Sequence, residues 1–174
     1  MPAMPVIRQA SREDAEAIAA LCARAARGAY ERIRREIPPA TDWFGFVVAQ
    51  AGTDVAGVAG TGRSADRPDA CELFTLYVDP SCQRRGVGRA LVARSEAQAG
   101  MAGATHLDVA VMPGNAPAIR FYEACGFSPA GERPIYAPHG KDGGPDVAMV
   151  YTKKIAGISE FQELQEPQHH RQPS

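Results

Sequence analysis

A short turn rich in arginine and glycine separates an apolar segment from a segment with helical character. The turn reads QRRGVG (Gln83–Gly88); it follows LFTLYVDP (Leu73–Pro80) and precedes RALVARSEAQAG (Arg89–Gly100). A helix start presents unpaired N–H groups and about half a positive charge, and glycines let an anion approach the backbone closely. The arginines add formal positive charge at the same point. The turn therefore predicts a phosphate or pyrophosphate site; the alternative is a solvated arginine turn whose glycines serve only its tight geometry.

Two common nucleotide-binding motifs can be tested against this turn. A P-loop requires a lysine directly after its second glycine, and the chain has no lysine there. A dinucleotide-binding fingerprint requires a third glycine, whereas Ala90 and Leu91 follow the two glycines here. The turn fits neither motif.

Length and charge limit the ligand that such a turn can serve. The chain has 174 residues, 45% hydrophobic and 22% charged, which suits one globular domain with its own core. A formal net charge of -1 gives no general affinity for nucleic acid or anionic membranes, so we expect a small ligand. We also expect a cytoplasmic protein, because the sequence lacks a signal peptide and the roughly 18 consecutive apolar residues of a membrane span.

Hydrophobic patterns predict an α/β domain. Ser11 with Asp14 resembles a capping box and begins a helix that places Ile18, Leu21 and Cys22 on one face. The expected strands are Val6–Ala10, Trp43–Gln50, Val55–Gly62, Cys71–Val78, His106–Val111, a strand from Phe127, and Val147–Lys153; the other expected helices are Gly88–Gln98 and a helix from the Asn115 cap to Ala124, with helical turns in Tyr30–Ile37.

The turn also matches a family motif. Gln83, Gly86 and Gly88 fit the pattern [QR]-x-x-G-x-[GA] of the GCN5-related N-acetyltransferase (GNAT) superfamily, which the chain resembles here. A second segment, NAPAIRFYEACGF (Asn115–Phe127), is similar to the family signature N-x-x-A-x-x-[FY]-Y-x-x-x-G-F. The resemblance implies an α/β fold with a single mixed, mostly antiparallel central sheet, flanked by helices, whose splayed central strands hold the cofactor. We expect this domain over residues 1–156 and a polar, disordered C-terminal tail over 157–174.

The resemblance implies acetyl-coenzyme A (acetyl-CoA) as donor. Its pyrophosphate would bind the backbone amides of Arg84–Ala90, and its pantetheine arm would pair along the strand Leu76–Val78. Asn115 would cap its helix and hydrogen-bond the pantetheine. The full set of implied donor-binding residues is Leu76, Tyr77, Val78, Gln83, Arg84, Arg85, Gly86, Val87, Gly88, Arg89, Ala90, Asn115 and Ala118.

Tyr122 is the first candidate catalytic residue. It occupies the tyrosine position of the family signature, which implies a proton donor to the departing thiolate. The alternative is a core aromatic beside Ile119 and Phe121. The neighbouring Cys125 invites an acetyl-cysteine mechanism, but no histidine accompanies it in the motif, so we expect direct transfer.

Glu72 is the second candidate. Strand alternation predicts that its side chain faces the same side as Phe74 and Leu76, and that Tyr77 faces the other way. In many relatives a glutamate on this strand relays a proton from the substrate amine through water, so the resemblance implies a general base. The alternative is a strand-end carboxylate in solvent.

Cysteines and histidines indicate no metal site. Four scattered cysteines lack a C-x-x-C pair, so we expect reduced thiols and no zinc: Cys22, Cys71, Cys82 and Cys125. His106 begins a strand and is expected to be structural, and His169 and His170 lie in the predicted tail.

The resemblance therefore implies an N-acetyltransferase, and we expect it to move an acetyl group from acetyl-CoA directly to a primary amine of a small molecule. Two alternatives stay open: a protein or peptide N-terminal acetyltransferase, and a non-catalytic acyl-CoA-binding sensor, which the retention of Tyr122 and Glu72 disfavours. We expect the acceptor pocket to be built from Tyr30–Asp42 and Tyr136–Pro145. The expected partners are the amine acceptor and a second copy in a homodimer, with no nucleic acid and no membrane.

Overall fold

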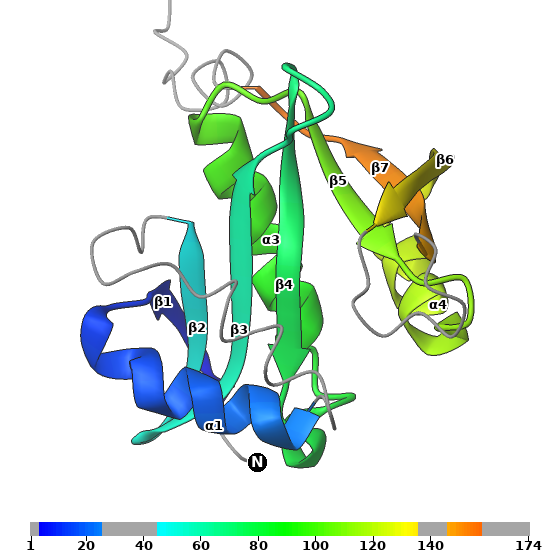
Figure 1. The fold of residues 1–174 in the computed structure, drawn as a ribbon. Helices are drawn as coiled ribbons and strands as arrows, with labels where there is room; N and C mark the ends of the chain where they lie inside the picture. The colour runs from blue at the N-terminus through cyan, green and yellow to red at the C-terminus, as the bar shows by residue number, and fades with distance from the viewer. Residues whose placement is uncertain (1–3, 26–44, 136–145, 158–174) are drawn as a thin grey trace, which may run out of the picture.

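The computed structural model describes residues 4–25, 45–135 and 146–157. The strands are β1 (Val6–Gln9), β2 (Phe46–Ala51), β3 (Asp54–Arg63), β4 (Ala70–Val78), β5 (His106–Val111), β6 (Ser128–Ile135) and β7 (Asp146–Lys154); the helices are α1 (Ala15–Ala25), α3 (Val87–Met101) and α4 (Ala116–Ala124), with short 3-10 helices η1 (Arg12–Asp14) and η2 (Pro80–Cys82). Figure 1 shows α1 and α3 on opposite faces of one sheet and α4 beside β5 and β7.

The sheet is mixed and mostly antiparallel, as predicted. In the described residues its seven strands follow the order β1-β2-β3-β4-β5-β7-β6. Only β4 and β5 pair in parallel, with α3 as the crossover between them. Every other neighbouring pair is antiparallel. The predicted elements lie within a few residues of the observed ones, and α3 extends three residues beyond its predicted end, to Met101.

The two parallel strands separate along their length. They pair only from Ala70 opposite His106 to Glu72 opposite Asp108, and Figure 1 shows them diverging beyond that point. On the side facing β5, residues 73–78 of β4 therefore have no strand partner within the described part of the chain. The predicted splay of the central strands is present, and it leaves backbone groups free to bind a ligand.

Each face of the sheet has its own apolar cluster. As predicted, Ile18, Leu21 and Cys22 of α1 are fully buried on one face, where they pack with Ala10, Phe46, Val48, Val55 and Val58. The other face packs under α3 and includes Val87, Leu91, Val92, Cys71, Leu73, Leu107, Val109 and Tyr122. Burial of these side chains on both faces fixes the strand register, because a one-residue slip would reverse every side chain.

A β-bulge in β4 changes which side chains share a face. Thr75 pairs with Gly60 and Leu73 pairs with Thr61, so Phe74 is an extra residue with no partner in β3. Leu73 and Leu76 consequently both face α3, whereas Phe74 and Tyr77 face the side of α1. The predicted alternation is therefore wrong beyond the bulge: Leu76 does not share a face with Phe74, and Tyr77, predicted to face the other way, does. Bulges re-aim side chains in this way beside many active sites.

The start of α1 is fixed by a carboxylate. The Ser11 N–H donates to Asp14 Oδ2 at 2.8 Å, which is half of the predicted capping box. Arg8 in β1 donates to the two oxygens of the same carboxylate at 2.8 and 2.7 Å. Asp14 thus joins the first strand to the first helix, and a single turn of 3-10 helix precedes α1.

Several predictions concern residues outside the described ranges. These are the helical turns of Tyr30–Ile37, the acceptor segments Tyr30–Asp42 and Tyr136–Pro145, and the tail after Gly157. Within the described ranges, no helix combines the length and the apolar character needed to cross a membrane.

Candidate active site

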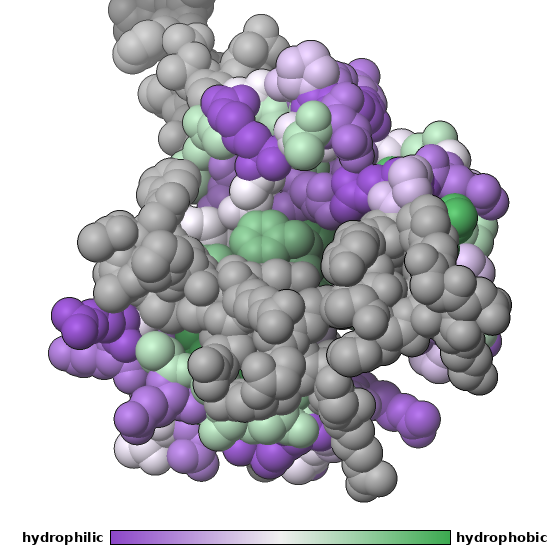
Figure 2. All heavy atoms as spheres, viewed as in Figure 1, coloured by the Kyte–Doolittle hydropathy of each residue, from purple (hydrophilic) through white to green (hydrophobic). Residues whose placement is uncertain are grey.

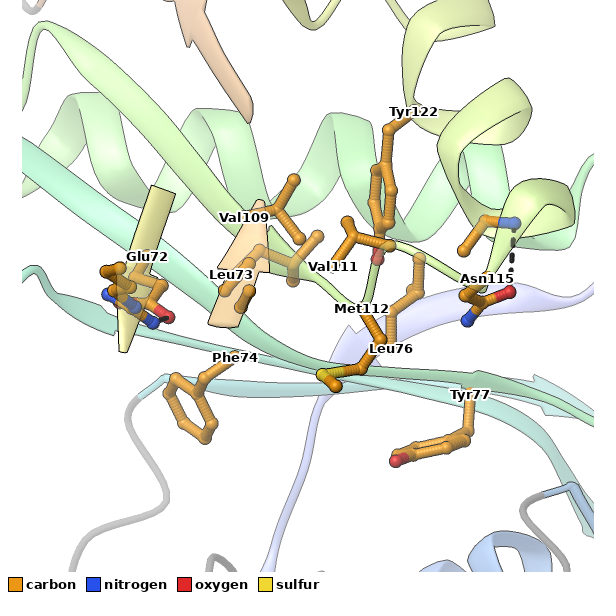
Figure 3. Close-up of a pocket in the computed structure, with 14 residues that line it drawn as sticks. Glu72, Leu73, Phe74, Leu76, Tyr77, Val109, Val111, Met112, Asn115 and Tyr122 are labelled. Atoms are coloured by element: carbon orange, nitrogen blue, oxygen red, sulfur yellow. Dashed lines mark hydrogen bonds and ion pairs between the residues drawn. The ribbon is translucent and has the colours of Figure 1, made fainter. Parts of the chain in front are cut away.

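A cleft of about 350 Å³ opens where β4 and β5 separate. Its walls come from both strands, from the first turns of α4 and from single residues of β6 and β7 (Figure 3). The lining residues are Glu72, Leu73, Phe74, Leu76, Tyr77, Val109, Ala110, Val111, Met112, Asn115, Ala118, Tyr122, Arg133 and Ala148. The cleft therefore brings together both predicted catalytic residues and four of the predicted donor-binding residues, Leu76, Tyr77, Asn115 and Ala118.

The arginine- and glycine-rich turn lies at the end of β4, beyond the cleft lining. Gly86 caps α3 with φ 81° and Arg84 has φ 61°, two left-handed residues within one turn. Left-handed geometry is costly for a residue with a side chain, so the turn is strongly specified at Gly86. The first helical hydrogen bond runs from the Ala90 N–H to the Gly86 carbonyl at 3.0 Å. The N–H groups of Gly88 and Arg89 precede it and point out of the helix start.

The side chains of the turn divide into exposed and structural groups. Gln83, Arg84, Arg85 and Arg89 are exposed, as a ligand-facing turn requires. Two other predicted donor-binding side chains are structural. Val87 is 2% exposed within the apolar cluster under α3, so its side chain lies away from any ligand. Val78 packs against the same apolar cluster. A Cβ at Gly88 would lie 3.2 Å from the Phe121 ring, so this glycine also allows α3 and α4 to approach closely.

Asn115 caps α4 and borders the cleft. Its Oδ1 accepts a hydrogen bond from the Ala118 N–H at 3.3 Å, which confirms the predicted cap. Pro117 stands in the first turn, where the missing N–H has no cost. The side-chain oxygen is thus occupied by the helix, whereas the amide NH₂ of Asn115 is a donor that the cap does not use.

Tyr122 presents its hydroxyl to the cleft from α4. Its ring lies edge-on to Phe121 and Phe127, with centroids 5.3 and 5.6 Å away. Figure 3 shows the hydroxyl pointing between Leu76 and Val111, toward the gap between the strands. Burial raises the pKa of the phenol well above its ordinary value, with smaller contributions from Cys125 and Tyr77. The side chain is therefore both part of the core and a neutral donor at the cleft.

Arg133 of β6 holds Glu72 by a two-point ion pair. Its Nη1 donates to Glu72 Oε2 at 2.9 Å, and its Nη2 donates to the other carboxylate oxygen. Nη1 also donates to Asp66 at 2.8 Å. The hydrogen bonds with Glu72 are the largest cause of a raised Arg133 pKa. The sequence did not predict Arg133, because 61 residues separate it from Glu72 and neither signature includes it.

A second carboxylate lies next to Glu72 across the paired strands. Asp108 of β5 is 4% exposed and accepts hydrogen bonds from Arg67 Nη1 at 3.1 Å and Thr152 Oγ1 at 2.5 Å. Arg67 also pairs with Asp69 at 3.2 Å. Asp108 is buried behind Glu72 and is not part of the cleft lining. Sequence reasoning missed it because a lone aspartate in an apolar strand carries no motif.

Two other predicted candidates lie away from this cleft. Cys125 is buried outside the lining, and burial raises the pKa of its thiol, so it is a protonated core residue. His106 Nδ1 lies 3.2 Å from Asp69 Oδ2 and is structural, as predicted. The described residues hold no group of His, Cys, Asp and Glu side chains arranged as metal ligands. His169 and His170 lie outside the described ranges.

Comparison with known proteins agrees with this geometry. A model of the Acetyltransferase (GNAT) family matches residues 7–127. Among curated proteins, the [ribosomal protein bS18]-alanine N-acetyltransferase of Escherichia coli K12 is 38% identical over 82 residues. That match covers 47% of this chain and 55% of the relative, so the chain spans about half the length of the curated relative.

Solved structures extend the likeness over most of the chain. The crystal structure of the Escherichia coli ribosomal-protein-S18-alanine N-acetyltransferase has a TM-score of 0.67 at 27% identity and covers 89% of this chain and 97% of that one. YncA from Salmonella typhimurium, solved with its cofactor acetyl-CoA, has a TM-score of 0.62 at 20% identity, covers 87% of this chain and 94% of that one, and shares the fold alone. With the family model matched from β1 through α4, this chain belongs to the GNAT family of acetyltransferases.

Proposed function

We propose that this protein transfers an acetyl group from acetyl-CoA directly to a primary amine. The observation that supports this most strongly is the convergence of separate parts on one cleft. An arginine-rich helix start with a left-handed Gly86, an unpaired edge of β4 and a buried tyrosine hydroxyl come from segments far apart in sequence. Together they supply the three features that acetyl transfer from acetyl-CoA would use: a site for the phosphates, a strand edge for the pantetheine arm and a proton donor.

The donor would lie along β4. The exposed helix start of α3 suits a pyrophosphate, because its N–H groups and three arginines offer complementary charge. The unpaired edge of β4 from Leu76 to Val78 suits the amides of the pantetheine arm, and Asn115 offers a further donor. When bound, acetyl-CoA supplies an activated acetyl thioester at the cleft.

The protein residues would then manage two protons. As the acceptor nitrogen forms its bond to the acetyl carbon and the carbon–sulfur bond breaks, the amine loses a proton and the thiolate gains one. We assign the thiolate proton to Tyr122, whose hydroxyl points into the gap between the strands. Because burial raises the pKa of the phenol, this donation depends on close positioning against the developing thiolate. We assign the amine proton to Glu72, reached directly or through water. The two hydrogen bonds from Arg133 hold the Glu72 carboxylate in place at the cleft.

A small-molecule amine is the acceptor that we favour, and a peptide N-terminus is the second candidate. The second is supported by the similarity to an enzyme that acetylates the alanine of ribosomal protein bS18, both in sequence and over the whole fold. Both acceptors present the same primary amine to the cleft, so the chemistry assigned to Tyr122 and Glu72 is common to them.

Thiol release tests the activity. Purified protein is mixed with acetyl-CoA and a panel of small primary amines and N-terminal peptides, and free thiol is followed by a colorimetric reagent. We expect release that depends on both acetyl-CoA and an amine, with the acetylated product confirmed by mass. If acetyl-CoA binds by calorimetry and no acceptor in the panel releases thiol, the domain is an acyl-CoA sensor and the proposed activity is wrong.

A further inference from the structure

We propose that Phe74 and the adjoining cluster of Glu72, Arg133 and Asp66 form the acceptor subsite, and that this subsite selects primary amines carrying an aromatic or other flat apolar group and no neighbouring carboxylate. The inference rests on the proposed function, since it names the substrate class of the same cleft. It starts from the β4 bulge, which brings Tyr77 to the same face as Phe74 and turns Leu76 to the opposite face.

The Phe74 ring is exposed in the cleft. Its residue is 40% exposed, and among the described residues it is one of two large exposed hydrophobic side chains in the lining, with Met112 at 37%. Figure 2 shows a hydrophobic area in a hollow over the middle of β3 and β4, on the face that α1 also covers. Large apolar side chains exposed together inside a cleft indicate a ligand surface.

The ring is held in place. A Cβ at Gly60 would lie 2.9 Å from the Phe74 ring and a Cβ at Gly62 would lie 3.4 Å from it, so the ring lies across β3 on two glycines. Phe46 packs against it edge-on, with centroids 5.5 Å apart and planes at 73°. The exposed part of the Phe74 ring is therefore fixed. It can stack on a flat group of the acceptor, and little side-chain conformational entropy is lost on binding.

The Phe74 ring and Tyr122, the proposed acid, lie on opposite sides of β4. Figure 3 shows Phe74 and Tyr77 on one side of β4, and Leu73, Leu76 and the Tyr122 hydroxyl on the other. A thioester lying between the strands would therefore meet Tyr122 on one side and an incoming amine on the side of Phe74. An apolar group attached close to the amine nitrogen would contact the Phe74 ring.

Charge in the subsite excludes a carboxylate on the acceptor. The Arg133 guanidinium already donates to Glu72 and Asp66, so its N–H groups are directed at protein carboxylates. Outside the cleft lining, Asp69 and Asp108 share Arg67, so the surrounding charged groups also include more carboxylates than guanidinium groups. An ammonium ion is attracted to this end of the cleft, whereas a substrate carboxylate meets like charges.

Two matched pairs of acceptors test the subsite. The first is 2-phenylethylamine against ethanolamine, and the second is an amidated tetrapeptide beginning with Phe against one beginning with Gly; thiol release gives kcat/KM for each. We expect the aromatic member of at least one pair to be favoured by about tenfold or more. The pair that shows the preference identifies a small-molecule or a peptide source. Equal values within both pairs would overturn the proposal.

Variants locate the preference at Phe74. Phe74→Ala should lower kcat/KM for the aromatic acceptor by roughly tenfold and leave the polar one within about twofold, because only the first contacts the ring. Phe74→Leu, which keeps apolar bulk, should lose less. Calorimetric affinity for acetyl-CoA and the melting temperature serve as controls for folding. An equal loss for both acceptors would make Phe74 structural and overturn the assignment.

A third comparison tests charge, and a binding measurement separates this inference from the activity. Phenylalanine amide should exceed phenylalanine by about tenfold in kcat/KM after correction of each value for the fraction of neutral amine, since only phenylalanine brings a carboxylate. Equal corrected values or the reverse order would contradict the assigned charge. If no acceptor turns over, calorimetry of 2-phenylethylamine with the coenzyme A complex still decides: weaker binding to Phe74→Ala than to the parent supports the subsite, and no difference overturns it.

Discussion

Tyr122 combines two properties that usually conflict. Its ring is 8% exposed and packs between Phe121 and Phe127, yet its hydroxyl reaches the gap between β4 and β5. Burial disfavours the phenolate, so the raised pKa keeps the proton on the oxygen at neutral pH. A neutral phenol in a tightly packed position is a fixed hydrogen-bond donor, which suits a group that must meet charge developing on a thiolate.

Replacement of this hydroxyl should affect rate and leave binding intact. We expect Tyr122→Phe to keep acetyl-CoA affinity within about twofold and to lower kcat by about 10² or more, the usual effect of a positioned proton donor. The matched control is Tyr151→Phe, which removes the hydroxyl of another buried tyrosine outside the cleft lining. A full rate and unchanged pH profile for Tyr122→Phe would assign the proton to water or to Tyr77.

Glu72 should matter most when the amine is protonated. Acceptor amines carry a proton at neutral pH, so a base is most needed at low pH. We expect Glu72→Gln to lower kcat/KM by about tenfold or more near pH 6.5 and by much less near pH 9.

Asp66→Asn is the control for Glu72, because it contacts the same guanidinium from a more exposed position. Because Asp66→Asn keeps the proposed base, any loss in kcat/KM should be equal at all pH values. A loss in Glu72→Gln that is equal at all pH values would show that Glu72 serves only to hold Arg133.

Gly103, just after the end of α3, is a matched control for Gly86 at the start of the same helix. Gly86 and Gly103 have φ of 81° and 84°, and neither has a crowded Cβ position. An aspartate should cost each site a similar backbone strain, on the order of 1 to 2 kcal/mol. Only Gly86→Asp places a carboxylate where the pyrophosphate would bind.

We therefore expect Gly86→Asp to abolish the thermal shift caused by acetyl-CoA, and Gly103→Asp to retain it. Differential scanning fluorimetry with increasing acetyl-CoA measures both. Loss of the shift in both variants would attribute the effect to helix strain, and retention in both would place the phosphates elsewhere.

The start of α1 should make the fold sensitive to acid. Hydrogen bonds from Arg8 lower the pKa of Asp14 from 3.8 to about 2. A lowered pKa stabilises the fold above the ordinary value, and this stabilisation is lost as pH falls from about 4 toward 2.

Asp14→Asn should thus lower the free energy of unfolding by about 1 to 2 kcal/mol at pH 7, allowing for solvent screening at the half-exposed Arg8. The difference from the parent should shrink below pH 4. Urea unfolding at several pH values measures it, with the exposed Glu13→Gln as control. A difference that persists unchanged to pH 3 would show that ionisation of Asp14 is not its cause.

At the scale of the whole molecule, donor binding should stabilise the fold. The proposed donor contacts β4, α3 and α4 together, so it binds only the native arrangement of all three. A ligand at 100 times its Kd stabilises by about 2.7 kcal/mol, which corresponds to roughly 5 to 10 °C in Tm for a domain of this size. We expect such a shift with acetyl-CoA and none with ATP or NAD at equal concentration. Tighter calorimetric binding of ATP than of coenzyme A would contradict the donor assignment.

Local signals in the sequence determined the elements and the proposed donor end of the site. The left-handed Gly86, the Asn115 cap and the Ser11–Asp14 pair each act over three or four residues, so neighbouring residues alone suffice to predict them. The two signatures also predicted the family and the placement of Tyr122 at the cleft. Each of these features is set by backbone geometry that the immediate sequence imposes.

The proposed acceptor end was decided only by tertiary structure. Whether β4 continues its alternation at Phe74 depends on its register with β3 and on packing against Phe46, and neither is encoded in β4 itself. The partner of Glu72 comes from β6, which the order of strands in the sheet brings across 61 residues. Long-range pairing reflects the balance of burial and chain entropy over the whole sheet, so residues 71–78 alone could not reveal which side chains share the cleft.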